Sequence, residues 1–242
     1  MKRIMFLVLL FLPFTTTFAL VFGVTANYPP FSSLADKQNH FYGFEPDIIQ
    51  AICSRIHESC QFKPMVVNDI PSALLSNTID FAAAAIIIPS KPNPLYLFSL
   101  PYLTSSVQAL IEKNSKIKKN EDLIGKTIGI RRFFGVEAFK EFLLKRWHNQ
   151  ITIQEYPGLG ELTEALNDHI VDAVITNSAA IEFWAINNSN TYALVGEKIP
   201  YGNGYGIMTH LGNEVLINRI NQAINDMMKD GTYLTIYSRY FQ

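Results

Sequence analysis

Leu74-Leu75-Ser76-Asn77-Thr78-Ile79-Asp80 and Leu166-Asn167-Asp168-His169-Ile170-Val171-Asp172 follow the same course along the chain. Each stretch leads from the end of an expected helix, through a polar turn, to an aspartate and an apolar run. Helices that alternate with short apolar strands are typical of α/β construction with largely parallel sheets. Two copies of one such unit predict a protein built from two similar halves.

The rest of the chain continues this alternation of helices and strands. The whole chain has 242 residues, of which 48% are hydrophobic, and this length allows one large or two modest domains. Short apolar runs predict strands over residues 21–25, 81–88, 107–112, 127–131, 151–156, 171–176 and 205–208, with a further strand opening at Cys60. Periodic apolar positions predict helices over residues 45–57, 69–76, 135–147, 161–168, 178–186, 213–229 and 233–240.

Residues 1–19 predict a secretory signal peptide. Lys2 and Arg3 precede an apolar run over residues 4–14, and small residues lead to a cleavage site after Ala19. The apolar run is shorter than the about 20 residues that a membrane-spanning helix needs. We therefore expect an exported protein without stable membrane insertion after cleavage.

Charge and motif content exclude several classes of function. The chain has 20 Lys and Arg against 21 Asp and Glu, and cleavage removes two bases, so a nucleic-acid partner is not expected. The histidines form no metal-ligand spacing with one another or with the cysteines. No Ser-His-Asp arrangement or phosphate-binding loop is found, so neither a metal nor a cofactor is expected.

A series of short motifs runs through the whole mature chain. In order, they are residues 28–31 (Tyr-Pro-Pro-Phe), 43–47 (Gly-Phe-Glu-Pro-Asp), 77–80 (Asn-Thr-Ile-Asp), 98–102 (Phe-Ser-Leu-Pro-Tyr), 122–126 (Asp-Leu-Ile-Gly-Lys), 171–174 (Val-Asp-Ala-Val), 230–233 (Asp-Gly-Thr-Tyr) and 240–241 (Tyr-Phe). This series resembles the periplasmic amino-acid-binding proteins of ABC importers, the solute-binding protein family 3. The resemblance implies an α/β, periplasmic-binding-protein-like type II fold, with two α/β lobes joined by a two-segment hinge.

Lobe boundaries follow from this resemblance together with the internal repeat. The first lobe is expected to contain residues 20–106 and 204–242, and the second lobe residues 107–203. The chain would cross between the lobes near Ser105-Ser106 and near Asn203-Gly204. Two short crossings can absorb a closing rotation, and a ligand that contacts both lobes shifts the population toward the closed state.

Cys53 and Cys60 are the only two cysteines. In an exported chain an even number at close spacing favours a disulfide, with two buried thiols or a metal pair as alternatives. Their spacing is also similar to the bridge of the lysine/arginine/ornithine- and histidine-binding members of the family.

The resemblance implies a ligand cleft, and the first lobe departs from the family pattern there. Tyr28 would stack on the ligand, or would pack beside prolines that hold its loop extended. Val67 stands where a second aromatic ring is frequent, so that wall is lost. Ala85, Ile87 and Pro89 replace hydroxyl residues.

The charged residues that grip an amino acid in the family are also replaced. Pro92 stands where an arginine would hold the α-carboxylate through two hydrogen bonds. Asn177 stands where an aspartate would bind the α-ammonium, and a neutral amide cannot neutralise a cation. Whether Lys91 or Arg132 contacts the ligand is left open.

Residues 131–135 (Arg-Arg-Phe-Phe-Gly) replace the Gly-Ser-Thr turn that binds the carboxylate in the family. We predict that Arg131 is a substitute anion anchor and that Phe133 or Phe134 restores the missing aromatic wall. The alternative is that Arg131 and Arg132 are solvated and that Phe134 packs in the core. Asp69 and Glu182 could also approach the cleft.

Three functions remain open. The first is a monomeric receptor that delivers a small polar, amino-acid-like ligand, or a more apolar or aromatic carboxylate, to the membrane subunits of an ABC importer. The second is an enzyme similar to the cyclohexadienyl dehydratases, which would need a general acid such as Glu161 or Glu182 in the cleft. The third is a periplasmic sensor or interaction module. The first is our prediction, and a non-enzymatic role follows from it.

Overall fold

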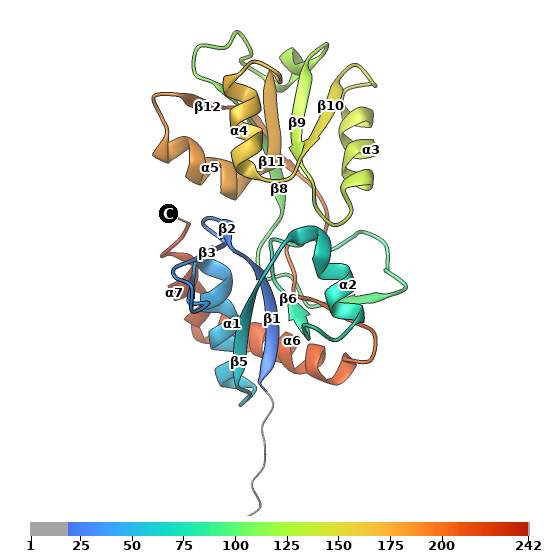
Figure 1. Ribbon diagram of the computed structural model, residues 1–242, viewed down its shortest axis with the longest axis vertical. Helices are drawn as coiled ribbons and strands as arrows, with labels where there is room; N and C mark the ends of the chain where they lie inside the picture. Colours follow the sequence, from blue (N-terminus) through green and yellow to red (C-terminus); the bar gives the residue numbers. More distant parts are fainter. Residues whose placement is uncertain (1–18, 242) are drawn as a thin grey trace, which may run out of the picture.

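The computed structural model describes residues 19–241 of the chain. Apart from Ala19, the predicted signal peptide lies outside the described residues. Two bodies lie one above the other along the longest axis, and each contains a five-stranded sheet with helices packed around it (Figure 1). We call them the first lobe, which contains β1, and the second lobe, which contains β8. Within residues 19–241, no helix combines the length and the apolar character needed to cross a bilayer.

The first lobe is built on a sheet with the strand order β5-β1-β6-β13-β7. Its strands are β5 (Cys60–Met65), β1 (Leu20–Thr25), β6 (Phe81–Ala82), β13 (Met208–His210) and β7 (Tyr96–Phe98). Its helices are α1 (Phe44–Arg55), α2 (Ile70–Leu75), α6 (Glu214–Asp230) and α7 (Thr232–Tyr237). A small sheet of β2 (Asn27–Tyr28), β3 (Ser32–Leu34) and β4 (Phe41–Tyr42) and the short 3-10 helix η1 (Val67–Asp69) complete the lobe.

The second lobe has the strand order β10-β9-β11-β8-β12. Its strands are β10 (Thr152–Tyr156), β9 (Thr127–Arg131), β11 (Ala173–Asn177), β8 (Ser106–Glu112) and β12 (Tyr192–Pro200). Its helices are α3 (Val136–Arg146), α4 (Leu159–Asn167) and α5 (Ser178–Asn187), with the 3-10 helix η2 (Asn120–Leu123). In each sheet two of the four strand pairings are parallel and two are antiparallel, because one strand, β13 or β8, runs against the other four, so the sheets are mixed rather than wholly parallel.

The repeated sequence unit has the same structure in both lobes. Each copy runs from a helix, α2 or α4, through a left-handed turn residue, Asn77 (φ 54°) or His169 (φ 55°), to its aspartate. Asp80 accepts a 2.8 Å hydrogen bond from the backbone N–H of Val21, and Asp172 accepts a 2.8 Å bond from the N–H of Thr127. Each aspartate thus ties its own unit to the start of the neighbouring parallel strand, β1 or β9.

The strand predicted over residues 81–88 is wrong beyond Ala82. Ala85 has a left-handed backbone (φ 50°), and its N–H donates to the side chain of Glu45 at 2.6 Å instead of to a neighbouring strand. The strand predicted over residues 205–208 also begins late, since Tyr205 forms only isolated bridges. β12 was not predicted, because its middle is exposed and its pairing with β8 is interrupted between Val195 and Ile199.

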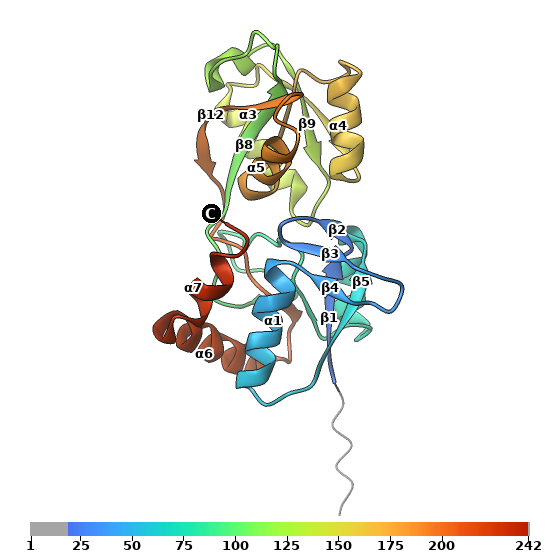
Figure 2. The ribbon, with the colours of Figure 1, turned by 90° about the vertical axis from the view of Figure 1, so that its left-hand side faces the viewer.

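The chain passes from one sheet to the other twice, through residues 99–105 and 201–207. The two segments are bonded together: the Tyr205 N–H donates to the Leu103 carbonyl at 2.8 Å, and the Gly204 N–H donates to the Ser105 hydroxyl at 3.0 Å. In the second view the chain that follows α7 reaches up to the level at which the lobes meet (Figure 2). A hinge at these crossings and the lobe boundaries given above stay predictions.

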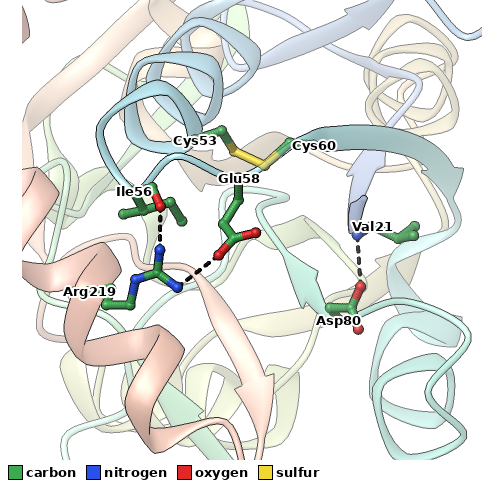
Figure 3. The surroundings of a disulfide bond; sticks show 7 residues. All are labelled: Val21, Cys53, Ile56, Glu58, Cys60, Asp80 and Arg219. Atoms are coloured by element: carbon green, nitrogen blue, oxygen red, sulfur yellow. Dashed lines mark hydrogen bonds and ion pairs between the residues drawn. A yellow bond between two sulfur atoms is a disulfide. The ribbon is translucent and has the colours of Figure 1, made fainter. Parts of the chain in front are cut away.

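Cys53 and Cys60 form a disulfide between α1 and the first residue of β5 (Figure 3). Beside it, Arg219 of α6 donates to Glu58 at 2.8 Å and also to the carbonyl of Ile56. The bridge closes the α1–β5 connection at the end of α1 that points away from the second lobe, and Arg219 ties this connection to α6.

Candidate functional site

The candidate site lies where β9 and β11 end. These strands are parallel neighbours, with Val174 beside Gly129, so their carboxyl ends meet at one edge of the second sheet. Arg131 is the last residue of β9 and Asn177 is the last residue of β11. This edge faces the first lobe (Figure 1). Crevices at the carboxyl ends of parallel strands are the usual ligand sites of α/β sheets.

Arg131 is buried, with 8% of its surface exposed, and its guanidinium carbon lies 3.8 Å from the ring centroid of Tyr28. Tyr28 belongs to the first lobe, so this cation–π contact joins the two lobes. Among the residues described, no carboxylate forms an ion pair with Arg131, and its buried Nε has no hydrogen-bond partner. The solvated loop position considered for Arg131 is therefore wrong.

Two further unpartnered polar groups face the same space as Arg131. The Oδ1 atom of Asn177 accepts from the N–H groups of Ala179 (2.9 Å) and Ala180 (3.2 Å), which caps α5. Its Nδ2, a donor, is buried and unpartnered. The hydroxyl of Tyr205 is also buried without a partner. Buried polar groups are normally hydrogen-bonded, so these three groups together indicate a ligand position.

Two adjoining cavities extend from this point between the lobes. The polar cavity is lined by Tyr28, Ala85, Ile87, Val107, Arg131, Phe133, Phe139, Thr176, Asn177 and Tyr205. The apolar cavity is lined by Val67, Ile70, Ala84, Ala85, Ile86, Phe133 and Phe134. All eight residues predicted to bind ligand thus lie along these cavities, which share Ala85 and Phe133. Their contact with a ligand stays a prediction.

Phe134 reaches from the second lobe onto the first. Its ring centroid lies 5.6 Å from that of Tyr96, edge to face, and 6.5 Å from that of Phe98. Both partners belong to β7. Phe134 therefore lines the apolar cavity and also packs against the margin of the first-lobe core, while its role as an aromatic wall for the ligand stays a prediction.

The other candidate residues do not line these cavities. Lys91, Pro92, Asp69 and Glu161 are exposed. Arg132 is exposed and pairs with Glu155 at 3.3 Å, while Glu182 pairs with Lys198 at 2.6 Å. Neither cavity has an acidic residue in its lining.

The pattern of Tyr28 and its prolines also differs from expectation. Residues 29–31 form a turn rather than an extended loop, and the Phe31 N–H donates to the Tyr28 carbonyl at 2.9 Å. The Pro29–Pro30 peptide is cis. The turn stacks Phe31 on the Tyr28 ring, with centroids 5.6 Å apart, which supports the tyrosine from the side of the first lobe.

Glu45 is a buried acid behind the polar cavity that the sequence analysis noted only as part of a motif. Its Oε1 accepts from the Ala85 N–H at 2.6 Å and from the Tyr102 hydroxyl, and its Oε2 has no partner. Burial raises the pKa of this carboxyl to about 7, although its two donors and the charge of Arg131 oppose the rise. Tyr205 was also missed, because no local pattern marks it.

Comparisons with known proteins agree with the fold. The family model of bacterial extracellular solute-binding proteins, family 3, matches residues 20–242. The crystal structure of an arginine 3rd transport system periplasmic binding protein from Legionella pneumophila superposes with a TM-score of 0.84 at 33% identity, over 92% of this chain and 99% of that chain. The L-cystine-binding protein TcyJ of Escherichia coli (strain K12) is 28% identical, over 92% of this chain and 82% of its own length.

A third similar protein connects the fold to an enzyme. The ancestral amino acid-binding protein AncCDT-1, described as a precursor of cyclohexadienyl dehydratase, has a TM-score of 0.78 at 26% identity, over 93% of this chain and 95% of that chain. The resemblance and the two-lobed α/β fold class inferred from the sequence motifs are confirmed by these comparisons.

Proposed function

From the premise that the chain belongs to the bacterial extracellular solute-binding proteins of family 3, we propose that it captures a small solute between its lobes and delivers it to the membrane subunits of an ABC importer. The solute is polar, of amino-acid size, and carries a carboxylate. One observation carries this proposal: the guanidinium of Arg131 is buried at the edge between the lobes without a carboxylate partner.

A buried charge is costly unless it is paired and hydrogen-bonded. A carboxylate ligand supplies that partner, and an arginine can hold both carboxylate oxygens at once. Because Arg131 lies in the second lobe and Tyr28 in the first, a ligand at this point contacts both lobes. Such a ligand favours the closed arrangement, which is the state that an importer would recognise.

The setting of this function is also proposed. Relatives of the chain carry names that describe them as periplasmic and as parts of ABC transporters. We propose that this chain is likewise periplasmic, that its signal peptide is cleaved after Ala19, and that it works as a monomer.

A ligand screen tests the proposal. A protein of residues 20–242 is unfolded and refolded to remove any bound solute, and its melting temperature is then measured with amino acids, polyamines, dicarboxylates and aromatic acids. A ligand that binds only the native state raises the melting temperature by mass action. We expect a carboxylate to stabilise the protein, Arg131→Ala to lose the effect, and the exposed neighbour variant Arg132→Ala to keep it.

Arg131→Gln is a second variant, which shows whether Arg131→Ala loses the effect only because it misfolds. It removes the charge but keeps a long polar side chain. If a solute stabilises the wild type and both Arg131 variants equally, the anchor is wrong. If no solute stabilises the wild type, capture of a small molecule is wrong, and a role in interaction or sensing is favoured. Uptake of the labelled solute by cells with and without the gene separates transport from sensing.

An enzyme is the second candidate, because the chain is similar to a precursor of cyclohexadienyl dehydratase and Glu45 is a buried acid with a raised pKa. Against it, Glu45 lies behind Ala85 and lines neither cavity. A general acid must reach the proton that it transfers. We therefore propose a binding protein without this activity, and turnover of prephenate by the purified protein would contradict that.

A further inference from the structure

We infer that the captured solute is a carboxylic acid with an apolar body and without a neighbouring ammonium group, so that free amino acids are weaker ligands. This inference narrows the substrate class and rests on the proposed function. It follows from the kinds of polar atoms that the site presents, from the absence of acids in its lining, and from the apolar cavity that continues from it.

The unpartnered groups at the polar cavity are suited to an anion. Arg131 Nε and Asn177 Nδ2 can only donate, and Tyr205 contributes a hydroxyl. The orientation of the Asn177 amide is fixed by its cap, because only the oxygen can accept from the N–H groups of Ala179 and Ala180. The site therefore offers a positive charge and donors to a carboxylate at one point.

An ammonium group beside that carboxylate would have no charged partner. Neither cavity is lined by an acid, and the amide oxygen that could accept from an ammonium already caps α5. The N-terminus of α5 adds a positive partial charge. Glu45, the nearest buried acid, bonds the N–H of Ala85 through Oε1 and lines neither cavity, so its unpartnered Oε2 is not offered to a ligand there. Removing an ammonium from water into this space therefore costs affinity.

The body of the solute is expected to be apolar. From the shared residues Ala85 and Phe133, the second cavity continues past Val67, Ile86 and Phe134 without a charged residue in its lining. An adjoining space of about 290 Å³, which shares Phe133 and Phe134 with this cavity and has no charged residue in its lining, has room for an aromatic ring or a branched aliphatic chain. Burial of apolar surface there is favourable. A lysine or arginine side chain would place a second cation beside Arg131 instead.

Matched ligand pairs that differ only in the ammonium group test the inference. Calorimetric titration of the refolded protein compares 3-phenylpropionate with L-phenylalanine, and 4-methylpentanoate with L-leucine. In at least one pair, the acid should bind about tenfold or more tightly than the amino acid. 2-Phenylethylamine and L-arginine should bind more weakly than that acid.

A variant sharpens this test by supplying the missing carboxylate. Asn177→Asp keeps a side-chain oxygen that can cap α5, so the fold should be retained. This variant should bind the carboxylic acid more weakly and the matched amino acid more tightly than the wild type does. The ratio of the two affinities should therefore fall by about tenfold. The control Asn190→Asp adds the same charge at an exposed turn and should leave both affinities unchanged.

The outcomes distinguish this inference from the proposed function. If an amino acid binds as tightly as its matched acid, or L-arginine binds more tightly than both acids, the inference is overturned while solute capture stands. If none of these compounds binds but another carboxylate from the wider screen does, the apolar body is wrong. If nothing in the wider screen binds, solute capture falls as well.

Discussion

The two walls of the cleft differ in what they offer a ligand. The wall from the first lobe is mainly apolar, with Val67, Ile70 and residues 84–87, and adds the ring of Tyr28 at the polar cavity; the N–H of Ala85 is already used by Glu45. The wall from the second lobe ends in Arg131, Thr176 and Asn177, with buried donors that lack partners. The difference suggests that the second lobe selects the charge of a ligand and the first lobe selects its shape.

This division has a structural origin. In the second lobe, two parallel strands end side by side, so their last residues place polar side chains at one edge. In the first lobe, β6 ends at Ala82, and the chain that follows turns its backbone toward Glu45. The first wall is therefore a loop held from behind by a buried acid.

The largest effect is expected from removing the charge of the second wall. Arg131→Met should lower the affinity for the carboxylate ligand by about 2–5 kcal/mol, because the ligand charge would be buried without a partner. Ile87→Ala, which shortens the first wall in the same cavity, should cost about 1–2 kcal/mol. Titration calorimetry gives both values. Equal losses would show that charge and shape are not divided between the lobes.

The stability of the protein should depend strongly on pH, because Glu45 of the first lobe is buried. The pKa of Glu45 is raised from 4.5 to about 7 in the folded protein, so the folded state binds a proton more tightly than the unfolded state. Protonated Glu45 therefore contributes to the free energy of unfolding. This contribution is complete below about pH 4.5 and is lost as the pH rises to about 7, a change of about 3 kcal/mol. Urea unfolding across this range should show the fall.

Glu45→Gln should remove this fall while keeping an acceptor for the Ala85 N–H and the Tyr102 hydroxyl. Glu214→Gln, on the surface of α6 away from the cleft, should retain it. The same titration predicts that a carboxylate ligand binds more weakly above about pH 7, since ionised Glu45 partly offsets the charge of Arg131. An unchanged fall in Glu45→Gln would assign the pH dependence to other groups.

The sequence predicted the scaffold better than the site. The repeated unit, the family motifs and the disulfide come from local patterns, and these predict helices and turns, whereas the strand order of the two sheets was not predicted. The substitution at Asn177 was recognised because a resemblance pointed to its position. The repeat also explains why Asp80 and Asp172 were conspicuous, since each bonds to the start of a neighbouring strand.

What the sequence could not give depends on contacts between distant segments. Tyr205 reaches the site from a crossing segment, and Glu45 gains its raised pKa only when the loop at Ala85 folds over it. Nor does any local pattern tell that Phe134 lies on Tyr96, because the two belong to different lobes. Burial and pairing across the cleft are properties of the assembled fold.

The contact of Phe134 with β7 joins the two walls, and removing it shows whether this contact holds the lobes together without a ligand. Phe134→Ala removes two aromatic contacts between the lobes, each worth about 0.5–1.5 kcal/mol. We expect the ligand-free protein to open, with a larger radius of gyration in small-angle scattering. Phe41→Ala, which removes a contact with Phe62 inside the first lobe, should lower stability without changing that radius. An unchanged radius for Phe134→Ala would show that other contacts hold the lobes together.

The smallest effect separates two roles of one residue. Asn177→Ala removes the cap of α5 and should lower the free energy of unfolding by about 1 kcal/mol, whereas Asn177→Asp keeps a capping oxygen and should lower it less. Both variants lose the Nδ2 donor, so both should bind a carboxylate more weakly. Urea unfolding and calorimetry on the same pair therefore separate the structural role from recognition. If Asn177→Asp bound the carboxylate as well as the wild type, this amide would belong to the scaffold alone, and Arg131 would carry the charge selectivity of the second lobe by itself.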